Sequence, residues 1–322
     1  MNKFCSFLAP LIQEYISCQK ASDHWNVSSS EPNLLLFDRY CLKAYPGETS
    51  LSQEIADSWC RKRDTEENNS CRARISVIVS FIRYLKKREK TDIMTPVLPR
   101  IEKSIYLPHA FTEMELQYFF CACDSISGET TSGQRARRIT IPVFFRFLYS
   151  SGIRTTEARL LRVADVDLSN GVLNIRYSKG PGQHFIVLHD TMLDLMRKYD
   201  AAISKMNPGR TYFFPSRTGK CYTRQWVQAN FRELWDKNNT PHATAYELRH
   251  HYAIENINRW TGYGMEFHAK LLYLSKSMGH TDLESTKYYY SLVPGFADII
   301  AKKTRESFDL IVPEVQQHEE IN

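Results

Sequence analysis

A stretch without helical or strand periodicity divides this chain of 322 residues into two parts. It contains Pro96, Pro99 and Pro108, and a residue that precedes proline is disfavoured in the α-helical conformation. The stretch can therefore be extended but cannot continue a helix. Since 43% of all residues are hydrophobic, the chain holds enough apolar side chains for two cores. We expect two domains, residues 1–103 and residues 104–322.

The first part reads as helices at about 4–18, 32–44, 50–63 and 70–89. Apolar residues form one stripe along the last of these helices. Between Arg61 and Lys90 the chain carries ten basic residues against four acidic ones. Two interpretations fit these charges equally well: a helix face exposed to solvent, and a surface that contacts the phosphates of a nucleic acid. The candidate DNA-binding residues are Arg72, Arg74, Arg83, Lys86 and Lys87.

The second part is helical except between Gly171 and Leu188, where two apolar runs flank Ser178-Lys179-Gly180. This pattern predicts a β-hairpin with Lys179 at its tip. Thr112 and Glu115 are spaced as a capping box, which predicts a helix that runs through Leu116 and Phe119. Further helices are expected at about 138–150, 190–205, 222–238, 243–258, 266–278, 283–290 and 295–308. The fold class is therefore mainly α with a small antiparallel β-sheet, in which a helical first domain precedes an α+β domain.

Composition narrows the classes of function. The net charge of +6 is only mildly basic, and no apolar run is long enough to span a membrane. The eight cysteines are scattered without metal-ligand spacing, which is typical of reduced thiols in a cytoplasmic protein. No Walker-type loop or carboxylate cluster is present. We expect a soluble protein of the cytoplasm.

Four pieces of the second part carry candidate chemistry. In Gly152-Ile153-Arg154-Thr155-Thr156-Glu157, a turn sets Arg154 at the start of a helix, where it can hold an anion or simply pair with Glu157. Lys179 at the hairpin tip is a solvated lysine or a proton donor. Tyr246 and Arg249 are expected on one face of one helix, either as a structural pair or as a site. The fourth piece, Gly279 to Tyr290, contains His280 and three consecutive tyrosines that cannot all face one core.

Taken together, in this order, the four pieces resemble the tyrosine recombinase or phage integrase family. The resemblance implies that Arg154 and Arg249 are the two catalytic arginines and that Glu157 supports the first. It implies that Lys179 is the catalytic lysine of the hairpin and that His280 is the histidine of the Gly-His box. In this family the nucleophile follows that histidine by nine positions, which selects Tyr289 over Tyr288 and Tyr290.

One departure from the family pattern concerns the second arginine box, where Tyr246 occupies the usual histidine position. A tyrosine can donate a hydrogen bond to phosphate but is a poorer proton shuttle near neutral pH. Proton handling is therefore expected of Lys179 and His280. A second departure is an apparent small insertion at residues 259–268, to which we assign no purpose.

The resemblance also implies a mechanism. The arginines and His280 would hold the scissile phosphate, Tyr289 would attack it, and Lys179 would protonate the leaving 5′ oxygen, giving a 3′-phosphotyrosine without metal or ATP. The resemblance also implies that residues 1–103 are a core-binding domain and residues 104–322 the catalytic domain, and that the two clamp double-stranded DNA between them. Further implied partners are copies of the chain in a tetramer and accessory DNA-bending proteins. In a prokaryote the enzyme would be associated with the nucleoid. The implied role is site-specific DNA recombination of the integrase or transposase kind, and the residues leave integration, excision, resolution and inversion equally open. A type IB topoisomerase-like relaxing enzyme and an inactive DNA-binding relative are the alternatives.

Overall fold

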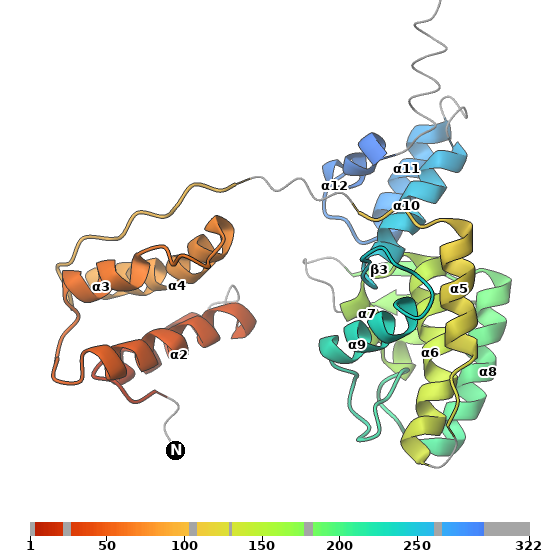
Figure 1. The fold of residues 1–322 in the computed structure, drawn as a ribbon, viewed down its shortest axis with the longest axis horizontal. Helices are drawn as coiled ribbons and strands as arrows, with labels where there is room; N and C mark the ends of the chain where they lie inside the picture. The colour runs from red at the N-terminus through yellow and green to blue at the C-terminus, as the bar shows by residue number, and fades with distance from the viewer. Residues whose placement is uncertain are drawn as a thin grey trace, which may run out of the picture. The chain divides into compact units, whose positions relative to one another are not determined.

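The computed structural model describes residues 4–21, 27–102, 108–128, 131–176, 183–260 and 266–292. The chain forms two compact units, Met1–Tyr106 and Leu107–Asn322, drawn in Figure 1. This division lies close to the one expected after residue 103, while the roles expected of the two parts stay predictions. Among the described residues, no helix is long and apolar enough to cross a membrane.

Within its described residues, the first unit contains four helices, α1 (Ala9–Lys20), α2 (Val27–Ala44), α3 (Gln53–Cys60) and α4 (Asn68–Lys86). Helix α1 begins later than expected because the backbone N–H groups of Cys5 and Ser6 bind the carboxylate of Asp38 instead of starting a helix. Pro10 then occupies the first turn of α1, where its missing N–H group has no helical partner to lose.

Helix α4 is the centre of the first unit, since α1, α2 and α3 all contact it. Its predicted apolar stripe is buried, with Ile78, Ile82 and Leu85 in the core shared with α1 to α3. The opposite side of α4 carries exposed Arg83 and Lys86, and Lys87 follows as its C-cap. The amphipathic pattern therefore fixes which face of α4 is buried.

The structure corrects the interpretation of Arg74 as a DNA contact. Its guanidinium group is buried, is paired with the carboxylate of Glu66 at 2.6 Å, and donates to the backbone carbonyls of Trp59 and Arg61. These partners join the end of α3 and the loop that follows it to α4. Arg74 is therefore a structural residue, because a group committed to buried partners is not available to DNA phosphate.

The second unit is built on α6 (Ser132–Ser151), which contacts α5 (Glu113–Asp124), α8 (Asp190–Met206) and α10 (Glu247–Trp260). Figure 1 shows α5, α6 and α8 side by side. Helix α5 starts at the predicted capping box of Thr112 and Glu115. Helix α6 begins earlier than the expected residue 138, because Thr131 and Gln134 form a second capping box.

The second unit also contains a three-stranded antiparallel sheet in the order β1 (Val166–Asp167), β2 (Val172–Ile175) and β3 (His184–Val187). Strands β2 and β3 are the predicted hairpin, and β1 is an additional strand. Leu173 of β2 pairs with Ile186 of β3, and both side chains are buried. The other elements of the second unit are α7 (Thr155–Leu160), η1 (Val163–Asp165), α9 (Arg224–Trp235), α11 (Glu266–Ser277), α12 (Glu284–Lys287) and η2 (Tyr288–Leu292). The prediction of a mainly α fold with a small antiparallel sheet is confirmed.

We predict that Arg74→Ala lowers the free energy of unfolding by about 3 kcal/mol, because it leaves the carboxylate of Glu66 largely buried without its partner. Arg83→Ala, on the exposed side of the same helix, should change it by less than about 0.5 kcal/mol. Urea denaturation of the full chain, followed by circular dichroism, measures both values. Equal effects of the two substitutions would contradict the structural role of Arg74.

The same pair predicts a pH dependence. The hydrogen bond from Arg74 lowers the pKa of Glu66 from 4.5 to about 2. The contribution of the pair is therefore present above about pH 4.5 and is lost as the pH falls towards 2, where the folded carboxylate is protonated. The difference in stability between the wild type and Arg74→Ala should narrow across that window.

Candidate active site

Arg154 is held at the junction of α6 and α7. Gly152 ends α6 with a φ of +62°, which reverses the chain, and Arg154 is the N-cap of α7. The carboxylate of Glu157 accepts the backbone N–H of Arg154 at 3.0 Å and its Nη1 at 2.6 Å. Because Glu157 is buried and contacts both the backbone and the guanidinium group, it fixes the direction in which Arg154 points.

Arg249 lies in the first turn of α10 and is only 1% exposed. Its Nη1 donates to the carbonyl of Gly152 at 2.7 Å, and its Nη2 donates to the carbonyl of Met278 at 2.8 Å. Both carbonyls lie at the C-terminal ends of helices, α6 and α11, where the helix dipole is negative and favours a cation. The Nε atom of Arg249 is buried and has no hydrogen-bond partner among the described residues. An anion in this place would complete the hydrogen bonding of the guanidinium group.

The turn formed by residues 278–280 joins the two arginines, since Nη2 of Arg154 donates to the carbonyl of Gly279 at 2.8 Å. Gly279 has a φ of +63°, in the left-handed region. A Cβ at this position would lie 2.6 Å from Cε1 of His184 and 3.1 Å from Nη1 of Arg154. Glycine is therefore required at position 279 for two reasons: the left-handed backbone conformation, and the space that His184 and Arg154 occupy.

His280 makes hydrogen bonds through both ring nitrogens. Its Nε2 lies 2.9 Å from Nη2 of Arg249, and its Nδ1 lies 2.7 Å from Oγ1 of Thr286. An arginine can only donate, so Nε2 accepts and the proton is on Nδ1, which donates to Thr286. Burial, followed by the charges of Arg249 and Arg154, lowers the pKa of His280 to about 4. The ring is therefore neutral near pH 7.

The three consecutive tyrosines differ sharply in exposure. Tyr289 is 3% exposed, whereas Tyr288 is 41% exposed, and the side chain of Tyr290 lies outside the described residues. The Tyr289 hydroxyl lies 3.1 Å from Nδ1 of His250, and its ring is stacked on that of His280 at 6.5 Å between centroids. Burial raises the pKa of Tyr289 to about 12, although Arg249 acts in the opposite direction. Of Tyr288 and Tyr289, the second has its hydroxyl inside the arginine and histidine cluster.

The position of Tyr246 differs from the expectation that it shares a helical face with Arg249. Helix α10 begins at Glu247, so Tyr246 precedes it, and its side chain is 40% exposed while that of Arg249 is buried. The ring of Tyr246 packs edge-on against the ring of His250 at 5.0 Å. The two residues are linked through the backbone, because the N–H of Arg249 donates to the carbonyl of Tyr246.

Two further histidines belong to this cluster and were not predicted from the sequence. His250 contacts Tyr289. Its position directly after Arg249 could have identified it from the sequence as a candidate site residue. His184 begins β3, is buried, and lies with Nε2 3.9 Å from Oε2 of Glu157. Only the three-dimensional contact identifies His184. Lys179, expected at the hairpin tip, lies outside the described residues.

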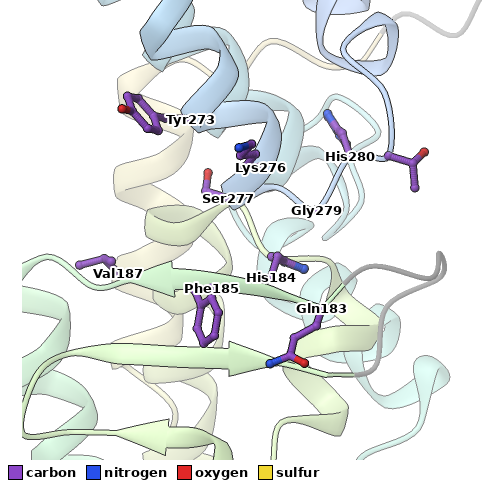
Figure 2. A pocket seen from close by; sticks show the side chains of 10 residues that line it. Gln183, His184, Phe185, Val187, Tyr273, Lys276, Ser277, Gly279 and His280 are labelled. Carbon is purple, nitrogen blue, oxygen red and sulfur yellow. The ribbon is translucent and has the colours of Figure 1, made fainter.

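An open cavity of about 640 Å³ adjoins the cluster. Figure 2 shows its lining, with His184 and Phe185 on β3 below Gly279 and His280, and with Lys276 and Ser277 at the end of α11. The cluster is therefore reached from one side through a space bordered by both polar and apolar side chains.

The candidate DNA-binding residues of the first unit differ in their exposure. Arg83, Lys86 and Lys87 are exposed at the end of α4, while Arg72 is partly buried and donates to the carbonyl of Pro99. Arg74 is structural, as described above. No group of three or more His, Cys, Asp or Glu side chains is arranged to hold a metal ion in the part of the chain that the structure describes.

Residues 111–294 match the model of the phage integrase family. A protein of Sinorhizobium fredii, described as an integrase/recombinase, is 26% identical over 96% of this chain and 98% of its own length. The tyrosine recombinase XerC of Staphylococcus saprophyticus is 24% identical over 69% of this chain and 71% of its own length. The match to the family model includes every described element of the cluster from Arg154 to Tyr289.

Solved structures share the fold. The XerH site-specific recombinase bound to palindromic difH substrate, after cleavage, superposes with a TM-score of 0.60 at 16% identity over 86% of this chain and 79% of that chain. A lambda integrase tetramer bound to a Holliday junction superposes with a TM-score of 0.57 at 14% identity over 87% of this chain and 76% of that chain. At these identities the likeness shows the fold alone.

We predict that Gly279→Ala damages the cluster far more than Gly209→Ala. Both glycines have a left-handed φ, but a Cβ at Gly209 meets nothing within 4 Å, whereas one at Gly279 would meet His184. The left-handed conformation alone costs about 1–2 kcal/mol, which Gly209→Ala should show in thermal unfolding. Gly279→Ala should lose more stability and also lose DNA strand cleavage. Equal losses from the two substitutions would contradict the close packing at the turn.

Proposed function

The chain belongs to the phage integrase family and is a tyrosine-type site-specific recombinase that acts on DNA, and we propose that Tyr289 is its nucleophile. The observation that carries this proposal is the burial of the Tyr289 hydroxyl beside His250, with its ring against His280, which in turn contacts Arg249. A DNA phosphate bound by Arg249 would therefore lie near the hydroxyl that attacks it. The product is a 3′-phosphotyrosine bond and a free 5′ hydroxyl group.

Arg154 and Arg249 hold the scissile phosphate in this proposal. Charge on the non-bridging oxygens grows as the pentavalent transition state forms, and fixed cationic donors stabilise it by several kcal/mol. The buried Nε of Arg249 supports this role, because it is a donor that lacks a protein partner among the described residues. Glu157 orients Arg154 by the hydrogen bonds already described. Attack by the tyrosine itself requires no metal or ATP.

Lys179 is the proposed donor of a proton to the departing 5′ oxygen. The support for this assignment is the resemblance of Ser178-Lys179-Gly180 to the catalytic hairpin of the family, since Lys179 lies outside the described residues. Tyr246 is proposed to border the site, where its hydroxyl can donate to a phosphate oxygen.

Double-stranded DNA is the proposed partner of both units, with the first unit as the core-binding domain and the second as the catalytic domain. The exposed Arg83, Lys86 and Lys87 support DNA binding by the first unit. A lambda integrase tetramer on a Holliday junction supports the proposal that recombination takes place in a tetramer. Accessory DNA-bending proteins and a cytoplasmic, nucleoid-associated location remain parts of the same proposal.

The nucleophile is tested by covalent trapping on nicked DNA that carries the native flanking sequence of the gene. We predict that wild-type protein and Tyr288→Phe form a protein–DNA adduct on a denaturing gel and that Tyr289→Phe forms none, because the reacting hydroxyl is missing. Tyr288→Phe is the matched control, since it removes the neighbouring, exposed hydroxyl. Loss of the adduct in Tyr288→Phe instead would identify Tyr288 as the nucleophile. DNA binding by the wild type without any adduct would favour a catalytically inactive DNA-binding protein.

DNA binding by the first unit is tested by its salt dependence. The triple variant Arg83→Ala, Lys86→Ala, Lys87→Ala should lower the slope of log affinity against log salt by about 0.9 for each lost phosphate contact. The control variant Lys20→Ala, Arg39→Ala, Lys43→Ala removes the same charge from exposed positions on α1 and α2. Fluorescence anisotropy with labelled duplex DNA measures both slopes. A similar slope for both variants would contradict a specific role of the α4 end.

A further inference from the structure

We propose that His250 accepts the proton that Tyr289 releases as it attacks the phosphate, and is thus a catalytic base of this chain. The inference rests on the proposed function, in which Tyr289 is the nucleophile. Tyr246 occupies the position of the usual histidine in the second arginine box, and the sequence alone assigned proton handling to Lys179 and His280. The geometry points to a different residue.

His250 is the imidazole that contacts the reacting oxygen. Its Nδ1 lies 3.1 Å from the Tyr289 hydroxyl, within the range of a hydrogen bond, and the two ring centroids are 5.6 Å apart. Both side chains are buried, at 8% and 3% exposure, so bulk water does not compete for this hydrogen bond. A general base must lie within hydrogen-bond reach of the proton that it removes, and His250 meets that condition.

His280 does not meet it in this arrangement. Its Nε2 accepts from Arg249 and its Nδ1 donates to Thr286, so both nitrogens are engaged with other groups. Its ring is stacked on the ring of Tyr289 rather than directed at the hydroxyl. Tyr246 supplies only a phenol, and its ring packs against His250. His250 therefore offers a ring nitrogen at hydrogen-bond distance from the nucleophilic oxygen, as neither His280 nor Tyr246 does in this arrangement.

The protonation state of His250 agrees with a base. Burial and the adjacent Arg249 lower its pKa to about 4, while Glu247 acts in the opposite direction, so the ring is neutral near pH 7 and has a lone pair to offer. The other titratable groups that face it are the phenols of Tyr246, Tyr288 and Tyr289. A phosphate anion bound beside Arg249 would offset the charge that weakens the base. Substrate binding would therefore oppose the effect of Arg249 on His250 at the moment when the proton must leave, while the effect of burial stays.

The step balances as follows. The Tyr289 oxygen forms a bond to phosphorus, the bond from phosphorus to the 5′ oxygen breaks, and the tyrosine proton moves to Nδ1 of His250. Lys179, in its proposed role, gives a proton to the 5′ oxygen, and the phosphodiester keeps its single negative charge. In the reverse reaction His250 returns its proton to the departing tyrosine oxygen, so the same residue serves both directions.

The test measures the single-turnover rate of adduct formation for His250→Gln, with His251→Gln as the matched control. Glutamine keeps a polar side chain but cannot take up the proton, and His251 is the neighbouring histidine, stacked on Tyr149 instead of Tyr289. We expect His250→Gln to slow the step by a hundredfold to a thousandfold, roughly the contribution of a general base. We expect His251→Gln to stay within about threefold of the wild type. A wild-type rate for His250→Gln would overturn the proposal.

A second measurement separates a base from a residue that merely positions Tyr289. A fluorinated tyrosine at position 289 is more acidic and needs less help to lose its proton, so it should restore the rate of His250→Gln at least tenfold. Lys179→Ala should instead be restored by a 5′-bridging phosphorothiolate substrate, whose leaving group needs no proton, and His250→Gln should not be. Failure of the fluorinated residue to restore the rate would overturn the proposal. Absence of an adduct with wild-type protein would count against the proposed function itself.

Discussion

The guanidinium groups of Arg249, which is buried, and Arg154, which is partly buried, repel one another, and the arrangement of the site follows from how the chain offsets that repulsion. Burial and the charge of Arg154 lower the pKa of Arg249. The compensating groups are the carboxylate of Glu157 and the carbonyls of Gly152, Met278 and Gly279, which come from three separate parts of the second unit. Bringing them together requires two left-handed glycine turns. The site is thus an assembly of helix ends around positive charge, poised to receive an anion.

The same positive charge governs the two imidazoles beside it. Burial, followed by the charge of Arg249, lowers the pKa of both His250 and His280, so that each ring is neutral and can accept a hydrogen bond. One ring accepts from Arg249 and the other contacts Tyr289. Two histidines with similar pKa values therefore differ in their proposed roles because of their hydrogen-bond partners, which is a difference of geometry rather than of basicity.

Local patterns predicted the parts of the structure that depend on short-range contacts. The pairing of Arg154 with Glu157 is a contact over one helical turn, and the hairpin follows from alternating apolar runs. Long-range contacts were beyond such patterns: Arg74 is buried because Glu66 and two carbonyls surround it, and His184 joins the cluster through tertiary packing. The exposure of Tyr246 was missed because the helix expected from about residue 243 begins only at Glu247, so Tyr246 precedes it. The choice of Tyr289 rested on counting and stays a prediction, to which its burial now adds independent support.

The burial of Tyr289 bears on whether a cut DNA strand can be resealed. A phosphodiester transferred to a hydroxyl that is 3% exposed would sit where few water molecules can reach it. Hydrolysis would leave the DNA permanently nicked, whereas a shielded linkage waits for the 5′ hydroxyl of a strand to reseal it. Under the proposed function, the burial of Tyr289 thus determines whether strand cutting by this protein ends in a permanent break or in a reversible strand exchange.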